Sequence, residues 1–212
     1  SWLSVDADDH SAAFRSGIGG QWATIVDLKD SENRILIGPH HGIDHVELSP
    51  DGRWVASSSW GGVGVNLWDA TSGARRSDNP LEPRAIKCNV AFSPDSRWLT
   101  ISTPEDWVSV GVQDGKTRFR VSRPNQDDWP GALAYMPDGQ MIVAAHSRFD
   151  LALLDAETGR QMVVFHAPSN TGFHDCDVSD DGSILAASSD RSIHVWNLRR
   201  LRSTLGTMGL DW

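Results

Sequence analysis

Apolar and polar residues alternate in short runs, and the same succession of runs returns several times along the chain. Ahead of the sequences SPDG, SPDS, MPDG and SDDG, apolar residues occupy every second position. This spacing is typical of a half-buried β-strand, because successive side chains of a strand point to opposite faces. The apolar pairs are Val46/Leu48, Val90/Phe92, Leu133/Tyr135 and Cys176/Val178, with Leu3/Val5 in a less regular first copy.

The four sequences that follow these pairs predict tight turns, because Gly accepts a positive φ and the Asp side chain can bond the nearby backbone. Each turn leads into a further predicted strand, where an apolar residue stands four positions after the Asp. The segments NRILIG and RQMVVF predict weaker fourth strands. Before Asn197 no window of ten or more residues has a helical period, so the sequence predicts an all-β fold.

The chain repeats itself with a period near 43 residues. The turn residues Asp51, Asp95, Asp138 and Asp181 follow one another at intervals of 44, 43 and 43 residues, and Asp8-Asp9 marks a first copy. A second marker recurs at a similar distance, as Val26-Asp27, Trp68-Asp69, Gly111-Val112, Leu154-Asp155 and Trp196-Asn197. Five repeats are therefore predicted, near residues 1–37, 38–80, 81–122, 123–165 and 166–198.

The turn SPDG followed at a fixed offset by LWD resembles the tryptophan-aspartate (WD) repeats of β-propellers, over about residues 1–198. The resemblance implies four-stranded blades around a common axis. The fifth repeat is expected to lack its outer strand, because the sequence after Leu198 does not have the pattern of a fourth strand. Seven blades, the commonest number in the family, would need about 300 residues. The chain is therefore expected to be the C-terminal arc of a larger ring, closed by the rest of its parent chain.

The resemblance also implies a His–Ser–Asp–Trp hydrogen-bond network inside each blade. This sequence departs from that pattern, because Gly38-Pro39-His40-His41 replaces the usual Gly-His of the second repeat. The Asp expected between the second and third strands is found as Asp190, and as Glu105 or Asp106 in the third repeat. We expect these networks to be mostly incomplete and the blades to depend on packing.

The segment after Asn197 has the only helical pattern in the chain, with Leu198, Leu201, Leu205 and Met208 on one side and Gly209 as its end. The predicted domains are thus a propeller segment, 1–198, and a helical tail, 199–212. The ending LRRLR…LGLDW resembles the propeller ends of large multidomain bacterial proteins, notably those of planctomycetes. In those proteins such modules often follow a Ser/Thr protein kinase domain.

Composition narrows the possible partners. The 19 basic and 28 acidic residues give a net charge of −9, so we expect no nucleic-acid partner held by a broad basic surface. No apolar run approaches the roughly 20 residues that cross a bilayer, and this segment is expected to make no membrane contact. Two cysteines cannot form a disulfide framework. The compartment stays unknown from sequence, with the cytoplasm favoured.

Each motif that suggests catalysis or metal binding also has a plainer interpretation. The sequence HHGIDH at residues 40–45 could bind zinc, but neighbouring side chains of an extended segment point to opposite faces. Residues 177–182 match half of a calcium loop and lack its closing Glu, so they predict a hairpin. Cys176 is near His174 but occupies a core position, where burial would raise the pKa of its thiol. We expect no catalytic residue, no metal and no cofactor.

The resemblance implies a partner-binding face instead. In WD propellers one face of the ring collects the loops that enter the first strands and those that join second to third strands. Trp and Arg on such loops fit interface hot spots, although Trp107 could instead start the third strand and pack internally. The candidate partner-binding residues are Asp44, Trp60, Glu105, Trp107, Trp129, Arg148, Phe149 and His174.

The function expected from these features is a non-catalytic signalling scaffold that binds a protein or peptide through its loop face. Two alternatives stay open. One is a sensor or regulatory domain that follows a bacterial Ser/Thr protein kinase domain. The other is a propeller that binds a small molecule, or acts as an enzyme, in its central channel with Asp44, His45 and His174.

Overall fold

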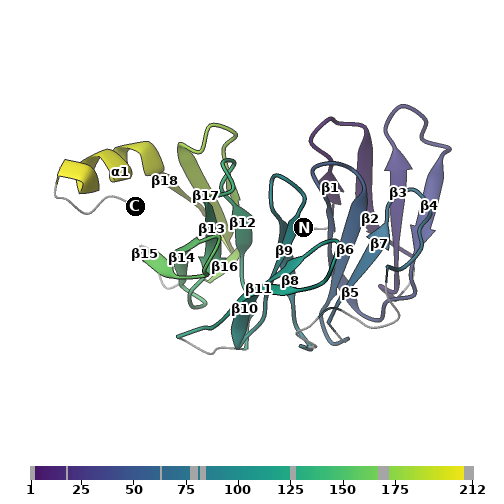
Figure 1. The fold of residues 1–212 in the computed structure, drawn as a ribbon, viewed down its shortest axis with the longest axis horizontal. Helices are drawn as coiled ribbons and strands as arrows, with labels where there is room; N and C mark the ends of the chain where they lie inside the picture. Colours follow the sequence, from purple (N-terminus) through teal and green to yellow (C-terminus); the bar gives the residue numbers. More distant parts are fainter. Residues whose placement is uncertain are drawn as a thin grey trace.

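The computed structural model describes residues 3–17, 19–62, 64–76, 81, 85–124, 128–166 and 172–207. These residues form five antiparallel sheets and one helix, which confirms the predicted all-β fold. Within every sheet the strands are paired in the order in which they follow along the chain. Figure 1 shows the sheets following one another along an arc, from the first sheet (purple) to the last (yellow-green).

Each sheet corresponds to one predicted repeat. The first holds β1 (Leu3–Val5), β2 (Ser11–Ser16), β3 (Trp22–Asp27) and β4 (Arg34–Ile37). The second holds β5 (Ile43–Leu48), β6 (Trp54–Ser59) and β7 (Val65–Asp69). The third holds β8 (Asn89–Phe92), β9 (Trp98–Ser102), β10 (Asp106–Gly111) and β11 (Thr117–Ser122). The fourth holds β12 (Leu133–Tyr135), β13 (Met141–Ala145), β14 (Asp150–Asp155) and β15 (Gln161–His166). The fifth holds β16 (Phe173–Val178), β17 (Ile184–Ser189) and β18 (Ile193–Asn197).

The second sheet has an irregular outer edge. Three strands pair regularly, and the chain beyond β7 forms two isolated antiparallel bridges, Trp68 with Arg75 and Val65 with Leu81. Arg75 and Leu81 therefore lie beside β7, on the side where the first, third and fourth sheets have a complete fourth strand.

Three of the four predicted turns, SPDG, SPDS and SDDG, share one side-chain hydrogen-bond pattern, whereas the MPDG turn has Met136 in place of the Ser. In the second repeat the Ser49 hydroxyl donates to Asp51 Oδ1 at 2.6 Å and accepts the backbone N–H of Trp54 at 2.9 Å. Gly52 has φ 68°, the left-handed conformation that Gly adopts without a steric penalty, while Ser96 takes φ 58° in the third repeat. The Ser-x-Asp sequence thus closes the hairpin by side-chain bonds as well as by backbone conformation.

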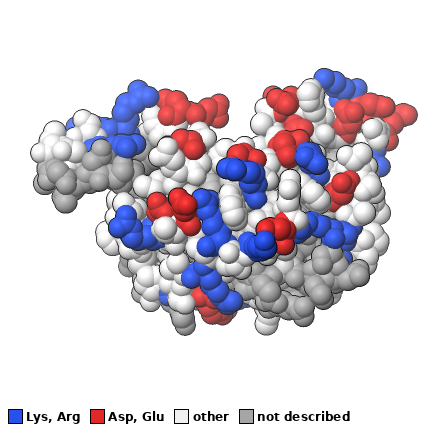
Figure 2. Space-filling view, in the orientation of Figure 1, with Lys and Arg blue, Asp and Glu red and all other residues white. Residues whose placement is uncertain are grey.

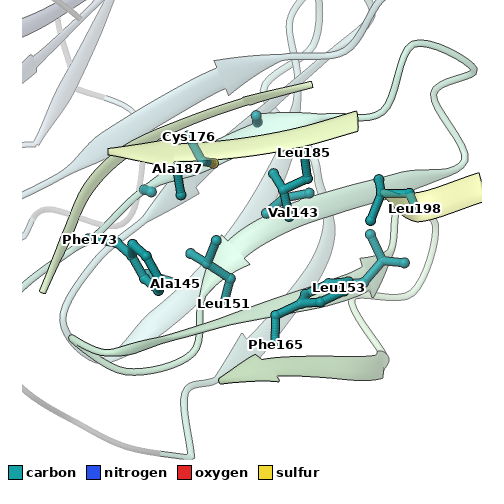
Figure 3. Packing of buried hydrophobic residues seen from close by; sticks show 12 residues of the cluster. Val143, Ala145, Leu151, Leu153, Phe165, Phe173, Cys176, Leu185, Ala187 and Leu198 are labelled. Atoms are coloured by element: carbon teal, nitrogen blue, oxygen red, sulfur yellow. The ribbon is translucent and has the colours of Figure 1, made fainter. Parts of the chain in front are cut away.

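Among the described residues the apolar core consists of four clusters, one between each pair of successive sheets. The first strand of each sheet also contacts the first strand of the next, from β1 through β5, β8 and β12 to β16. Contacts of this kind place all the first strands on the inside of the arc, as the resemblance to a propeller implied. Figure 3 shows the cluster between the last two sheets, where Phe173 and Leu185 face Val143 and Leu151.

Sheets inside the arc are covered on both faces, whereas the two end sheets each have one open face. All six residues of β10, in the third sheet, are buried. In the fifth sheet Leu185 is fully buried against the fourth, but Ile193 and Val195, which point the other way, are 72% and 63% exposed. Leu3 and Leu36 of the first sheet are both 57% exposed.

The predicted tail helix is α1 (Leu198–Thr207). The Asn197 side chain caps its first turn, since Oδ1 accepts the backbone N–H of Arg200 at 2.8 Å. Leu198 is 4% exposed and belongs to the cluster between the fourth and fifth sheets (Figure 3). Leu201 packs against the same cluster. Residues 208–212 of the predicted tail lie outside the described residues. No helix in the described part of the chain has the length and apolar character of a membrane span.

A central cavity lies between the first strands. Its volume is about 890 Å³, and all five sheets contribute to its wall, among them Val5, Glu47, Phe92, Tyr135 and Cys176. A wall to which the first strand of every sheet contributes is the radial arrangement that the resemblance to β-propellers implied.

Candidate functional site

The candidate site lies where the first strands begin, at the opposite end of these strands from the Asp turns. Asp44, Cys88, Gly131 and His174 each stand seven residues before the turn Asp of their repeat. All four line a cavity of about 600 Å³, which we call the mouth cavity. The repeat therefore places one residue from each of four successive repeats around a common opening.

Two of these equivalent residues lie in irregularities of the strand pairing. The register shifts between Ile43 and His45 in β5, and between Phe173 and Asp175 in β16. Asp44 and His174 are the extra residues at these points. A bulge of this kind turns a side chain away from the direction that regular alternation would give it. The two predicted residues are thus placed by the same local device in the second and fifth repeats.

Three predicted residues from different loops form one aromatic cluster, which we call the mouth cluster. The Trp60 and Trp129 rings lie 5.1 Å apart, and the Trp129 and His174 rings lie 5.6 Å apart, both edge to face. Aromatic rings favour this geometry because the positive edge of one meets the negative face of the other. Trp60 comes from the β6–β7 connection, Trp129 precedes β12 and His174 lies in β16, so the cluster joins the second, fourth and fifth sheets.

The mouth cluster is held by two cations that the sequence did not indicate. Lys87 Nζ lies 4.8 Å from the centre of the Trp60 ring and forms an ion pair with Asp128 at 2.5 Å. The Arg123 side chain, 2% exposed, donates from Nη1 to the backbone carbonyls of Thr103 at 2.9 Å and Trp129 at 2.6 Å. Nothing in the local pattern around these residues distinguishes them from ordinary surface cations.

Gly131 fixes the approach of the Trp129 loop to the fourth sheet. Its φ is 74°, and a Cβ at this position would lie 2.0 Å from the Cβ of Ala145. Asn89 Nδ2 donates to the Gly131 carbonyl at 2.9 Å, which ties the third sheet to the same loop. The loop that presents Trp129 is therefore positioned by contacts with two sheets.

Carboxylates occur on the walls of both cavities. Asp44 and Asp175 line the mouth cavity, and Glu47, Asp175 and Asp177 line the central cavity. The described lining of the two cavities includes no Lys or Arg. Elsewhere acidic and basic side chains are intermixed, as on the face in Figure 2. The charged residues among the described lining of the cavities are thus all acidic, whereas the face in Figure 2 carries both signs of charge.

The neighbours of these carboxylates differ. Asp44 Oδ1 lies 3.8 Å from Arg15 Nη1, and Glu47 Oε2 lies 3.3 Å from His45 Nε2. Asp175 Oδ1 accepts the backbone N–H of Cys176 at 3.0 Å and forms no ion pair with a described residue. Asp175 is thus the lining carboxylate at the mouth without a described cation beside it.

Both cysteines are buried core residues. Burial raises the pKa of the Cys88 thiol to about 12 and holds the pKa of Cys176 well above its usual value. The His174 ring makes its hydrogen bond with Asp190, at 2.5 Å from Nε2 to Oδ1. Neither thiol has the lowered pKa of a catalytic cysteine, and the predicted rise at Cys176 is confirmed.

The remaining predicted residues do not join the mouth cluster. Trp107 is 1% exposed and packs in the core between the third and fourth sheets. Trp107 therefore does not belong to the loop face. It packs internally, which is the other interpretation that the sequence allowed. Glu105 is exposed beside this core, and Arg148 and Phe149 are exposed in the β13–β14 turn. None of these four is among the described residues that line the two cavities.

The residues of HHGIDH have separate partners. The buried His40 ring lies with Nδ1 2.8 Å from the Ser57 hydroxyl, while His45 is beside Glu47 and Asp44 faces Arg15. No group of three His, Cys, Asp or Glu residues in the described ranges could hold a metal ion. These side chains therefore have separate partners in the second sheet and at the mouth cavity, and they do not converge on one point.

Comparison with known proteins yields a match to one family model and to several curated relatives. The family model described as "WD domain, G-beta repeat" matches residues 32–63 and 159–197. WD repeat-containing protein SL1-17 of Schistosoma mansoni is 30% identical over 165 residues, covering 76% of this chain and 52% of that protein. These matches support the interpretation of the chain as a WD-repeat β-propeller. Small ribosomal subunit protein RACK1 of Candida albicans is 30% identical over 156 residues, 69% of this chain and 48% of its own.

The match of the WD-repeat model is limited to two parts of the chain, and the chain spans about half the length of these relatives, 52% and 48%. In the second repeat the WD pattern accounts for a buried network. Trp68 Nε1 donates to the Ser57 hydroxyl at 2.8 Å, and His40 reaches the same hydroxyl from the other side. Three members of the His–Ser–Asp–Trp set are thus joined here.

Proposed function

We propose that this chain is a non-catalytic scaffold that binds a protein or peptide partner at the mouth cavity. The observation that carries the proposal is the mouth cluster, in which Trp60, Trp129 and His174 from three sheets meet beside a cavity of about 600 Å³. Trp residues dominate interface hot spots because they exclude water from a large contact area. Similarity to WD-repeat proteins supports the same interpretation, since these domains typically serve as interaction scaffolds.

The rigidity of the mouth favours binding. Trp60 is 39% exposed, but its ring contacts both the Lys87 ammonium and the Trp129 ring. Arg123 and Gly131 in turn fix the Trp129 loop. A surface that is already ordered loses little conformational entropy when a partner binds.

Selection from a random linear peptide display library tests the proposal. Peptides enriched on the 212-residue chain should bind at least about tenfold more weakly to Trp60→Ala and to Trp129→Ala, because loss of a hot-spot Trp costs about 2 kcal/mol or more. Leu28→Ala is the matched control: Leu28 is 49% exposed in the β3–β4 turn, away from the mouth. Circular dichroism should show that the variants are folded.

Binding that is unchanged in both Trp variants would contradict a partner site at the mouth. Equal weakening by Leu28→Ala would contradict it as well, since the effect would then be non-specific.

The position of this scaffold in a longer protein is a separate proposal. The tail resemblance implied a place after a bacterial Ser/Thr protein kinase domain, and the length of the relatives agrees with further blades that complete a ring. The sequence encoded upstream in the same reading frame tests both proposals directly.

A further inference from the structure

The mouth cavity and the central cavity adjoin each other. Leu3, His45 and Asp175 line both, so one continuous depression runs from the mouth cluster along the first strands. The part at the mouth cavity is lined by Trp60 and Trp129, and the part at the central cavity is lined by strand side chains such as Phe92 and Tyr135. An extended segment of a partner could therefore enter at the cluster and continue along the strands.

The charge of this depression has one sign. Asp44 and Asp175 lie at the mouth, and Glu47, Asp177 and Asp180 lie further in, whereas no described lining residue is Lys or Arg. Carboxylates gathered on low-dielectric walls attract a cation more strongly than they would on an open surface. An acidic or phosphorylated partner would meet repulsion here.

Aromatic rings and carboxylates at one opening form a recognisable combination. The face of a Trp ring attracts Lys and Arg side chains through its quadrupole, and a nearby carboxylate supplies the opposite charge. The molecule already shows this chemistry, because the Lys87 ammonium lies 4.8 Å from the Trp60 ring centre and pairs with Asp128. Trp129, His174 and Asp175 offer a second set of the same groups on the cavity wall.

The carboxylate best placed for this role is Asp175. It lines both cavities, follows directly after His174 of the mouth cluster and forms no ion pair with a described cation. Asp44, by contrast, has Arg15 at 3.8 Å. A ligand cation at Asp175 would therefore not need to displace a described side chain.

From these observations we infer that the mouth cavity binds the cationic side chain of a Lys or Arg residue in an extended peptide, between the mouth cluster and Asp175. This inference rests on the proposed peptide-binding function and names the chemistry of its ligand. The aliphatic stem of the Lys or Arg side chain packs against Trp129, and its charged end reaches the carboxylate.

The test uses the peptides selected on the chain, together with versions in which each Lys is replaced by norleucine and each Arg by citrulline. These replacements keep the length and remove the charge. We expect one basic residue in each enriched peptide to be required, with about a tenfold or greater loss of affinity when it is replaced. Asp175→Asn should cause a similar loss for the parent peptide and little for the neutral version.

The matched control is Glu157→Gln, which removes an exposed carboxylate from the β14–β15 turn. Asn at position 175 can still accept the Cys176 N–H, so the strand should keep its bonding. Affinity for the parent peptide should also fall with added salt, and this dependence should be smaller in Asp175→Asn.

Two results would overturn the inference. Enriched peptides that depend on Trp60 and Trp129 but bind equally well in their neutral versions would refute the cationic anchor and leave the scaffold proposal intact. Peptides that do not depend on either Trp would refute both. If Glu157→Gln lost as much affinity as Asp175→Asn, the effect would come from the net charge of the protein. That result would also refute the site.

Discussion

At the residue scale, the side chain of a turn Asp accepts hydrogen bonds that stabilise its own turn. Asp181 shows this in its turn: Oδ1 accepts the Ser179 hydroxyl at 2.8 Å and the Ser183 backbone N–H at 3.0 Å. Hydrogen bonds from Ser183 and Ser179 lower the pKa of Asp181 to about 2, and Arg199 lies 3.2 Å away. The ionised carboxylate is thus part of the folded hairpin.

The lowered pKa gives a prediction for acid stability. The folded form of Asp181 has the lower pKa, so its contribution to stability is present above the unfolded value of 3.8 and is lost as pH falls toward 2. Asp181→Asn should therefore be less stable than the parent chain near neutral pH, and the difference should shrink across this interval. Urea unfolding at a series of pH values measures it.

Asp180→Asn is the control for this titration, because Asp180 is the neighbouring exposed acid and its carboxylate makes no hydrogen bond with a described residue. A difference between Asp181→Asn and the parent chain that stayed constant from neutral pH to pH 2 would contradict the prediction.

At the element scale, packing between sheets and a few buried polar contacts hold the strands. In β6 the Ser57 hydroxyl joins His40 and Trp68, and all three residues are at most 5% exposed. The next residue, Ser58, is fully buried as well, yet its hydroxyl has no hydrogen-bond partner among the described residues. The two hydroxyls therefore differ in bonding but not in burial.

This pair gives a matched test of the WD-type network. Ser57→Ala should lower the free energy of unfolding by about 2–3 kcal/mol, since it leaves two buried polar groups without a partner. Ser58→Ala removes a hydroxyl that has no such partner and should change stability little. Chemical unfolding of both variants measures the difference, and equal effects would show that the His40–Ser57–Trp68 bonds contribute nothing.

The element scale also shows why Trp107 was misplaced as a surface candidate. The alternation of apolar and polar residues distinguishes one buried face of a strand from one exposed face. In β10 the sequence assigned Val108 and Val110 to the buried face. In an interior sheet both faces are covered, so Trp107 on the opposite face is buried against the fourth sheet. The alternation of β18 is equally regular, yet Ile193 and Val195 are exposed because no described sheet covers them.

At the scale of the whole molecule, the arc has two open apolar ends. Ile184, Ile193 and Val195 are exposed on the face of the fifth sheet that points away from the fourth sheet, and Leu3 and Leu36 are exposed on the first sheet. Leu3 and Ile193 also line the central cavity. Exposed apolar faces of packed sheets favour association, because burying them releases water.

We therefore expect the 212-residue chain to self-associate as its concentration rises. The double variant Ile193→Lys with Val195→Lys should reduce this association, while Ile86→Lys, at a residue 64% exposed outside the end sheets, should not. Light scattering over a concentration series measures the effect. A parent chain that stays monomeric throughout, or equal relief by Ile86→Lys, would contradict the role of the end faces.

The candidate site was partly accessible from sequence. Aromatic and charged residues on the loops indicated Trp60, Trp129 and His174, and the structure brings these three together. The repeat register could also have indicated Cys88 and Gly131, which stand at the positions equivalent to Asp44 and His174. Lys87 and Arg123 could not be found in this way, because their partners come from contacts between different repeats.

Features that depend on near neighbours in the chain could be inferred from the order of the residues alone. Alternation, the Ser-x-Asp turns and the 43-residue period gave the strands, the five repeats and the tail helix, since each follows from local backbone geometry. Which loops meet, which faces are covered and which carboxylates share a cavity became known from the folded structure. Those relations depend on how sheets stack around an axis, and residues such as Trp60 and His174, far apart in the chain, become neighbours only through that stacking.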